Sequence, residues 1–383
     1  MEQFQYSYSR MCRDLWNLQE AYHRYIKIEN LGKTEDGREL LTVLAGREEA
    51  HCHLLFQAGM HGREYMNCAL LTALLKDYLA GGGAEKNQNI CLHVVPMANP
   101  DGCTISQEGR GGIRDPGLRD WLWECYKREG REWEQQGRSG KGSGTRKGNV
   151  SEREFFSRWK ANARGVDINR NFDTGWKGGS LGRHEETSGV MPGKMPDAMS
   201  GKMPGTMPGK TSGVMPRKTS GVMPGEMPGA MPGKIPGETT TVMPGHKGYP
   251  GRAPHSEPET RAILKIAWQY PLACAISWHS SGSLIYWDYG AAGTLFLQDK
   301  RLADQLSQAT GYPLHSTVTD HASQGGCSDY FMEKYAVPSV TLETGRGRCP
   351  LPPGEFPVIF HENRNVWETA IAFSRGRRTE TGL

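Results

Sequence analysis

Short apolar runs separated by polar turns recur along the chain, and they predict buried strands alternating with helices. Continuous apolar runs, which indicate buried strands, lie at 53–59, 89–96, 273–278 and 338–342. Two shorter strands, at 25–29 and 39–45, flank the hairpin turn Asp36-Gly37. A further strand is expected at 283–287, directly after the third of the continuous runs.

Apolar positions at helical spacing lie between these strands. The expected helices are 8–25, 65–75, 117–136, 256–270, 297–310 and 361–376. Strand, helix and strand in succession predict an α/β fold with a mixed, mostly parallel, twisted sheet flanked by helices on both faces. In such sheets ligands bind at the carboxyl ends of the strands.

Residues 174–254 interrupt this pattern with variants of Met-Pro-Gly, and they hold much of the 49 Gly and 23 Pro of the chain. Pro and Gly at this density cannot bury enough apolar surface to offset the entropy of ordering, so the segment is expected to be disordered. We therefore predict one domain built from 1–173 and 255–383, with 174–254 as a low-complexity insertion. Methionine thioethers bind copper(I), but a flexible linker explains the composition more simply.

The net charge of +4 also originates in this segment, which holds ten Lys and Arg against five acids. The remainder is close to neutral, so the charge gives no argument for a nucleic-acid partner. Nine scattered Cys favour free thiols in a reducing compartment. The N-terminus has no signal-peptide pattern and no apolar run is long enough for a membrane span, so a cytoplasmic location is expected, unless the chain is exported by another route.

Four side chains that could bind a metal ion or transfer a proton lie at or just after the ends of predicted strands. His61 and Glu64 come after 53–59, His279 ends 273–278, and Glu343 ends 338–342. Two His and one Glu suit a single zinc ion with a fourth position open for water. Glu343 could then accept the proton of that water as general base.

Three further polar residues, Arg170, His51 and His53, are considered as candidates for binding substrate or metal. Arg170 offers a planar fork suited to a substrate carboxylate. His51 and His53 flank Cys52 in a way that superficially resembles a metal pair. Without a partner nearby in the sequence, they are interpreted as polar residues at a strand edge.

The chain resembles the zinc carboxypeptidases of the carboxypeptidase A type. The resemblance rests on short motifs in family order, namely His61-Gly-Arg-Glu64, Asn99-Pro-Asp-Gly102, Gly165-Val-Asp-Ile-Asn169-Arg170-Asn171-Phe172, Ser256-Glu-Pro-Glu-Thr260, His279-Ser-Ser-Gly282 and Leu342-Glu343-Thr-Gly345. It implies zinc on His61, Glu64 and His279. It also implies that Glu343 acts as base and then as proton donor, and that Asn169 and Arg170 hold the terminal carboxylate of a peptide.

Two positions depart from the animal enzymes of this family. Their oxyanion-stabilising Arg follows a Trp, whereas here Trp159 is followed by Lys160, which leaves Lys160 and Arg164 as alternatives. Their mobile Tyr lies four residues before a Gly-Gly pair, where this chain has His321, a third substrate-binding candidate beside Asn169 and Arg170.

Several motifs resemble the bacterial branch that cleaves γ-D-glutamyl–diamino acid bonds in cell-wall peptides. A murein peptide is therefore the expected substrate. The alternative is a general metallocarboxypeptidase that releases C-terminal amino acids. A third interpretation is a non-catalytic scaffold that carries the repeat, which an intact His/Glu/His/Glu set argues against.

Overall fold

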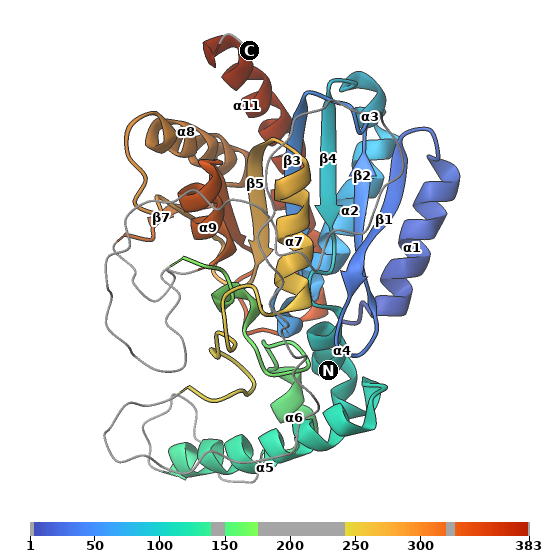
Figure 1. The fold of residues 1–383 in the computed structure, drawn as a ribbon, viewed down its shortest axis with the longest axis vertical. Helices are drawn as coiled ribbons and strands as arrows, with labels where there is room; N and C mark the ends of the chain where they lie inside the picture. The colour runs from blue at the N-terminus through green and yellow to red at the C-terminus, as the bar shows by residue number, and fades with distance from the viewer. Residues whose placement is uncertain (1–3, 139–149, 175–241, 319–325, 382–383) are drawn as a thin grey trace, which may run out of the picture. The chain divides into compact units, whose positions relative to one another are not determined.

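An eight-stranded sheet forms the centre of the computed structural model, which describes residues 4–138, 150–174, 242–318 and 326–381 (Figure 1). The strand order is β1-β2-β4-β3-β5-β8-β6-β7. The strands are β1 (Ile26–Lys33), β2 (Glu39–Ala45), β3 (Cys52–Ala58), β4 (Ile90–Val95), β5 (Leu272–His279), β6 (Leu284–Trp287), β7 (Leu314–Ser316) and β8 (Ser339–Glu343).

The sheet is mixed, and its centre is parallel. Strands β4, β3, β5 and β8 pair in parallel, whereas β1, β2 and β4 are joined by antiparallel pairings. On the far side β6 is antiparallel to β8 and parallel to β7. The next strand in the sequence, β4, pairs with one side of β3, and the later strand β5 pairs with its other side. The strand order therefore reverses between β3 and β5, and ligands usually bind at such a switch point.

Helices cover both faces of the sheet, which confirms the predicted fold class (Figure 1). The longer helices are α1 (Tyr8–Ala21), α2 (Met66–Ala80), α4 (Pro100–Glu108), α5 (Pro116–Arg138), α7 (Pro258–Gln269), α8 (Gly293–Thr310), α9 (Cys327–Tyr335), α10 (Phe356–Asn363) and α11 (Val366–Thr381). Apolar side chains of α1, α2, α8, α10 and α11 pack in one core cluster, and those of α7 and α9 in another. None of the helices described is long and apolar enough to cross a bilayer.

A third apolar cluster lies beyond the carboxyl ends of the central strands. It joins α4, α5 and the short helix α6 (Glu152–Ser157) through Ile105, Leu122, Phe155, Phe156 and the fully buried Trp159. These helices lie toward the bottom of Figure 1, where β4 ends. The cluster supports the segment that runs from Trp159 to Arg170, which carries several of the predicted site residues.

The sequence analysis missed some elements and merged others. It predicted neither α9 nor the three-residue strand β7. The single helix expected at 361–376 is two helices, α10 and α11, with Asn363 at the end of the first. The buried Asn363 side chain accepts a hydrogen bond from Trp278 Nε1 at 3.0 Å, so a polar contact with β5 holds the chain where the helix ends.

The predicted end of the insertion at 254 requires correction, because residues 242–254 belong to the folded unit. The carbonyl of His246 accepts from the amide of Lys160 at 2.9 Å, and that of Tyr249 accepts from Asp167 at 2.8 Å. Asn171 Nδ2 donates to the carbonyl of Pro250 at 2.8 Å. These carbonyls satisfy polar groups of the segment 160–171, which pattern and composition could not reveal. The rest of the predicted insertion, 175–241, lies outside the described residues.

Asn99 joins three parts of the backbone near the carboxyl ends of the strands. Its side chain is fully buried, and its Oδ1 accepts from the amide of Gly102 at 2.8 Å, capping α4. Its Nδ2 donates to the carbonyls of Met60 and Ala161, each at 3.1 Å. One side chain thus holds the loop after β3 against α4 and the segment after Trp159.

We expect Asn99→Ala to lower the free energy of unfolding by roughly 2–4 kcal/mol, because it removes a helix cap and leaves buried backbone groups unpaired. Urea denaturation followed by circular dichroism measures this change. Asn89→Ala, at an exposed position before β4, is the matched control and should change the value by less than about 0.5 kcal/mol. Equal effects of the two substitutions would contradict the role given to Asn99.

Candidate active site

Three buried side chains converge at the carboxyl ends of β3 and β5. His61 Nδ1 lies 2.9 Å from Glu64 Oε1, and His279 Nδ1 lies 3.0 Å from Glu64 Oε2. The two Nδ1 atoms are 3.1 Å apart. Two imidazole nitrogens and a carboxylate thus point at one position, and these residues form a group that could hold a metal ion. The donor set is the one that catalytic zinc prefers.

The loop between β3 and α2 positions the first two of these residues. His61 precedes a 3-10 helix, Gly62–Glu64, so the imidazole and the carboxylate lie one short turn apart. A Cβ on Gly62 would meet the carbonyl oxygen of Gly102 at 2.3 Å, so only glycine fits this close approach. The amide of Gly62 donates to the carbonyl of Lys160 at 3.0 Å, which fixes the loop against the segment after Trp159.

The other two predicted residues end neighbouring parallel strands. His279 is the last residue of β5 and Glu343 the last of β8, and the two are direct partners in the β5–β8 ladder. Ala58, which ends β3, is the partner of Trp278. Strand pairing therefore brings His279 and Glu343 to the edge of the sheet where the loop after β3 begins.

Polar partners orient the group that could hold the metal. Asp167 Oδ1 lies 3.3 Å from His61 Nε2, on the far side of the ring from Glu64. The amide of Ser280 donates to Glu64 Oε2 at 3.3 Å. A carboxylate behind a metal-binding imidazole fixes its orientation and raises its basicity.

Burial and neighbouring charges shift the carboxyl groups in opposite directions. Burial acts to raise the pKa of Glu64, but the imidazoles of His61 and His279 outweigh it and hold that pKa well below its usual range. Burial likewise opposes the charges of Lys160 and His61 at Asp167, whose pKa is also held well below its usual range. Glu64 is therefore ready to bind a cation.

Glu343 behaves differently, since burial raises its pKa to about 7. The charge of His279 partly offsets this, whereas that of Glu64 adds to it. A carboxyl group that titrates near neutral pH is suited to accept and return a proton. A cation bound nearby would lower the pKa of Glu343 from this raised value and favour its carboxylate form.

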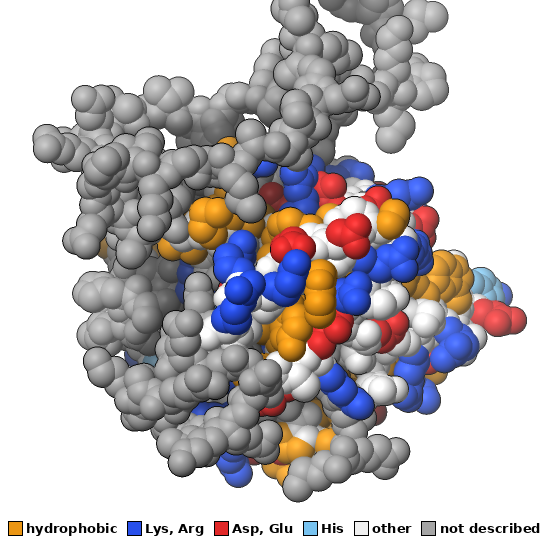
Figure 2. Space-filling view, turned by 90° about the horizontal axis from the view of Figure 1, so that it is seen from below, with side chains coloured by type: hydrophobic (Ala, Val, Ile, Leu, Met, Phe, Trp, Pro, Cys, Tyr) orange, Lys and Arg blue, Asp and Glu red, His pale blue; other side chains and the backbone are white. Residues whose placement is uncertain are grey.

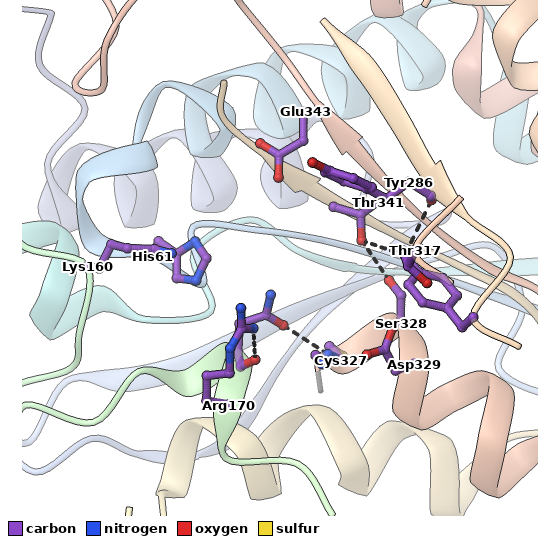
Figure 3. A pocket seen from close by; sticks show the side chains of 13 residues that line it. His61, Lys160, Arg170, Tyr286, Thr317, Cys327, Ser328, Asp329, Thr341 and Glu343 are labelled. Atoms are coloured by element: carbon purple, nitrogen blue, oxygen red, sulfur yellow. Dashed lines mark hydrogen bonds between the residues drawn. The ribbon is translucent and has the colours of Figure 1, made fainter. Parts of the chain in front are cut away.

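A cavity of about 220 Å³, here called the Arg170 cavity, lies on one side of the metal-binding group. His61, Lys160, Arg170 and Glu343 surround it (Figure 3). The other residues that line it are Asn169, Tyr286, Tyr289, Thr317, Gly326, Cys327, Ser328, Asp329 and Thr341. Asn169 is held in place because its Oδ1 accepts from the amide of Cys327 at 2.9 Å.

A second cavity of about 480 Å³, here called the Arg348 cavity, adjoins the first at the metal-binding group. It shares His61, Lys160, Tyr286 and Glu343 with the first, so the two form one cleft across the metal-binding group. The other residues that line it are Arg63, Glu64, Arg158, Ser280, Ser281, Arg348 and Cys349. Burial raises the pKa of the Cys349 thiol, which keeps it protonated at neutral pH.

The described surface at this edge shows basic and acidic side chains side by side, among hydrophobic ones (Figure 2). The cleft differs from this mixed surface in the charged side chains that line its two cavities. Arg63, Arg158, Lys160 and Arg348 line the Arg348 cavity, whereas the Arg170 cavity combines Lys160 and Arg170 with Asp329.

The structure separates two residues that the sequence left as alternatives. Lys160 lines both cavities, with its Nζ 3.9 Å from Asp167 Oδ2. Arg164 lines neither, and its Nη1 instead forms an ion pair with Glu35 Oε1 at 2.9 Å. His321 lies outside the described residues.

Sequence reasoning missed several residues of the cleft. Arg63 and Asp167 lie inside the motifs that carried the family resemblance, so a signal for them was present. Arg158 precedes the buried Trp159, and Asp329 lies in the unpredicted helix α9. Nothing in the sequence pattern indicated Arg348.

Comparison with known proteins agrees with this geometry. The zinc carboxypeptidase family model matches residues 11–198 and 236–365 and leaves out 199–235, which lie inside the predicted insertion. Gamma-D-glutamyl-L-diamino acid endopeptidase 1 of Lysinibacillus sphaericus is 24% identical over 373 residues, which cover 94% of this chain and 71% of that protein. The uncharacterized protein YqgT of Bacillus subtilis is 21% identical and covers 91% and 73% in the same order.

Solved structures show the same fold. Carboxypeptidase A from Helicoverpa armigera superposes with a TM-score of 0.57 at 19% identity, over 97% of this chain and 73% of that one. The structure of bovine thrombin-activatable fibrinolysis inhibitor with tick carboxypeptidase inhibitor gives a TM-score of 0.59 at 15% identity, over 97% and 98%.

We expect Glu343→Gln to lower kcat by roughly 10²–10⁴-fold, because the amide cannot accept a proton from water. Peptide hydrolysis and zinc content are measured on the same preparation. Zinc content should stay at the wild-type value, since Glu343 is outside the proposed ligand set. A fully active variant would show that another group is the base.

Lys160→Met and Arg164→Met form a matched pair for oxyanion stabilisation. Lys160→Met removes a cation that lines the cleft and should lower kcat by roughly 10²–10³-fold. Arg164→Met removes a cation that pairs with Glu35 outside the cleft and should leave kcat near the wild-type value. Zinc content is measured for both, because Lys160 also lies near Asp167. The reverse order of effects would exclude Lys160 from this role.

Proposed function

This chain belongs to the zinc carboxypeptidase family and is a zinc-dependent peptidase, and we propose that it cleaves γ-D-glutamyl–diamino acid bonds of bacterial cell-wall peptides. His61, Glu64 and His279 would hold the zinc ion, which supplies Lewis acidity and makes water ionise near neutral pH. The relative from Lysinibacillus sphaericus carries this specificity in its name.

The residues around the metal-binding group supply the remaining chemistry. Glu343 takes the proton from the attacking water and returns it to the leaving amine. Lys160, which lines both cavities, stabilises the negative charge that develops on the carbonyl oxygen. Asp167 keeps the His61 ring in position through its contact with Nε2.

The Arg170 cavity fits the leaving diamino acid. Arg170 and Asn169 would hold a carboxylate, and the carboxylate of Asp329 lines the same cavity. A diamino acid carries a carboxylate together with an additional amine, so it complements a cation and an anion in one cavity.

One arginine of the Arg348 cavity is the observation that carries the proposal. If the leaving residue occupies the Arg170 cavity, then the acyl residue faces the Arg348 cavity. Arg158 already pairs with Glu154 Oε1 at 2.8 Å, and Arg63 lies 3.9 Å from Glu64 Oε1. The exposed Arg348 is therefore the candidate partner of the substrate. A glutamyl residue linked through its γ-carboxyl group keeps a free α-carboxylate, which three carbons separate from the scissile carbonyl, whereas an ordinary α-linked apolar residue has an uncharged side chain on the acyl side. Arg348 would complement that carboxylate.

The test compares three substrates on wild-type protein. These are L-Ala-γ-D-Glu-diaminopimelate, the same peptide with the D-glutamyl α-carboxylate converted to an amide, and an α-linked peptide with C-terminal lysine. We expect kcat/KM to fall in that order, with about tenfold or more lost on amidation. Fastest cleavage of the α-linked peptide would instead support a general metallocarboxypeptidase.

Arg348→Met should remove most of the preference for the carboxylate over the amide substrate while leaving the rate on the amide largely unchanged. Arg346→Met is the matched control, because Arg346 lies two residues away on the surface and lines neither cavity. Equal ratios in wild type and Arg348→Met would show that Arg348 does not recognise the carboxylate.

A further inference from the structure

A second group that could hold a metal ion lies within the described residues, and it consists of His53, Cys91 and His93. One ligand atom from each lies within 4.8 Å of the others, and all three side chains are buried. His53 pairs with Cys91 in the parallel ladder of β3 and β4, and His93 follows two residues later, so the three share one face of the sheet. The prediction that His53 is a polar residue at a strand edge with no partner nearby is therefore wrong, because His53 is buried and lies beside Cys91 and His93.

This group is separate from the active site. His53 is the second residue of β3, whereas His61 lies beyond its last residue, Ala58. The seven residues of β3 span roughly 20 Å, so the two groups lie at opposite ends of the strand. Sequence reasoning found no partner for His53 because Cys91 and His93 lie on a different strand.

The contacts within the group leave one buried nitrogen without a partner. His53 Nδ1 lies 2.9 Å from His93 Nε2, which is a hydrogen bond between two rings. His93 Nδ1 has no hydrogen-bond partner, although its side chain is fully buried. This nitrogen lies on the opposite side of the ring from Nε2, so an ion held by His53 Nδ1 and His93 Nε2 would leave it unpaired.

Tyr270 and Glu48 close the group. The Tyr270 ring lies 4.7 Å from that of His53 and 4.4 Å from that of His93, measured between centroids. Its hydroxyl donates to Glu48 Oε1 at 2.9 Å. The carboxylate of Glu48 is exposed and also pairs with Lys27 Nζ at 3.1 Å, so the Tyr270 ring covers the group on the side that faces the surface.

The donor types of this group suit zinc, which binds imidazole nitrogen and thiolate sulfur. A metal ion would displace the thiol proton of Cys91 on binding.

The active site provides an internal standard for the spacing. Its ligand atoms lie 2.9–3.1 Å apart, and the ring nitrogens of His53 and His93 are equally close at 2.9 Å. We propose that His53, Cys91 and His93 bind a second zinc ion that links β3 to β4 and leaves its fourth position to a non-protein ligand. On binding, the Cys91 Sγ–H bond breaks, a Zn–S bond forms, and one proton is released to solvent. Thiolate and imidazole ligands favour zinc over magnesium or calcium, which prefer oxygen.

Zinc content tests the proposal directly. The full chain, purified with zinc present and then desalted, should hold about two zinc ions, one from each group. Cys91→Ser should hold about one, whereas the matched control Cys52→Ser should still hold about two. Cys52 is also buried on β3, but its side chain belongs to the core cluster on the opposite face of the sheet.

Cobalt(II) distinguishes the two groups by spectroscopy. The three candidate ligands of the active site include no thiolate, but Cys349 lines the cavity beside them. Cobalt at Cys91 is therefore identified by thiolate-to-cobalt charge-transfer absorption that persists in Cys349→Ser and disappears in Cys91→Ser. We expect this absorption in wild type and Cys52→Ser and its loss in Cys91→Ser. Loss of the peptidase activity in Glu343→Gln should leave it unchanged, which separates this proposal from the proposed function.

Two results on wild-type protein would overturn the proposal without relying on a variant that folds. These are about one zinc ion per chain under zinc saturation, and no charge-transfer absorption under cobalt saturation. Together they would show that the group is only a buried pair of hydrogen-bonded histidines beside a thiol.

Discussion

The parallel pairing of β3, β5 and β8 is the constraint on which the active site depends. Neighbouring strands lie about 4.8 Å apart, so residues at their aligned ends come within reach of one ion. His279 and Glu64 meet in this way although 215 residues separate them in the sequence. The backbone ladder, more than any side-chain contact, brings the candidate site residues together.

The loop after β3 adds the precision that the ladder alone cannot give. Gly62 touches two other backbone segments so closely that no side chain fits, and Asn99 ties the same region to α4. These contacts hold a carboxylate and two imidazoles in a buried, mutually attractive arrangement. Because the backbone contacts fix this arrangement, residues that line the two cavities can vary in charge while His61 and Glu64 keep their positions.

The sequence predicted the features that depend on local pattern. Buried strands, the helices between them and the polar residues at strand ends all follow from runs of neighbouring residues, and the structure places His61, Glu64, His279 and Glu343 together. Features set by distant contacts could not be predicted in this way. The choice between Lys160 and Arg164 depends on which one Glu35 pairs with, and the burial of His53 depends on a neighbouring strand.

Cys349 gives the cleft a chemical property that hydrolysis does not require. Its thiol lines the Arg348 cavity together with Glu64 and Glu343, and its raised pKa makes it a slow nucleophile toward reagents in solution. An inhibitor that first chelates the metal would hold an electrophile beside this sulfur long enough to react. The cleft thus offers a covalent anchor for selective, irreversible labelling of the enzyme.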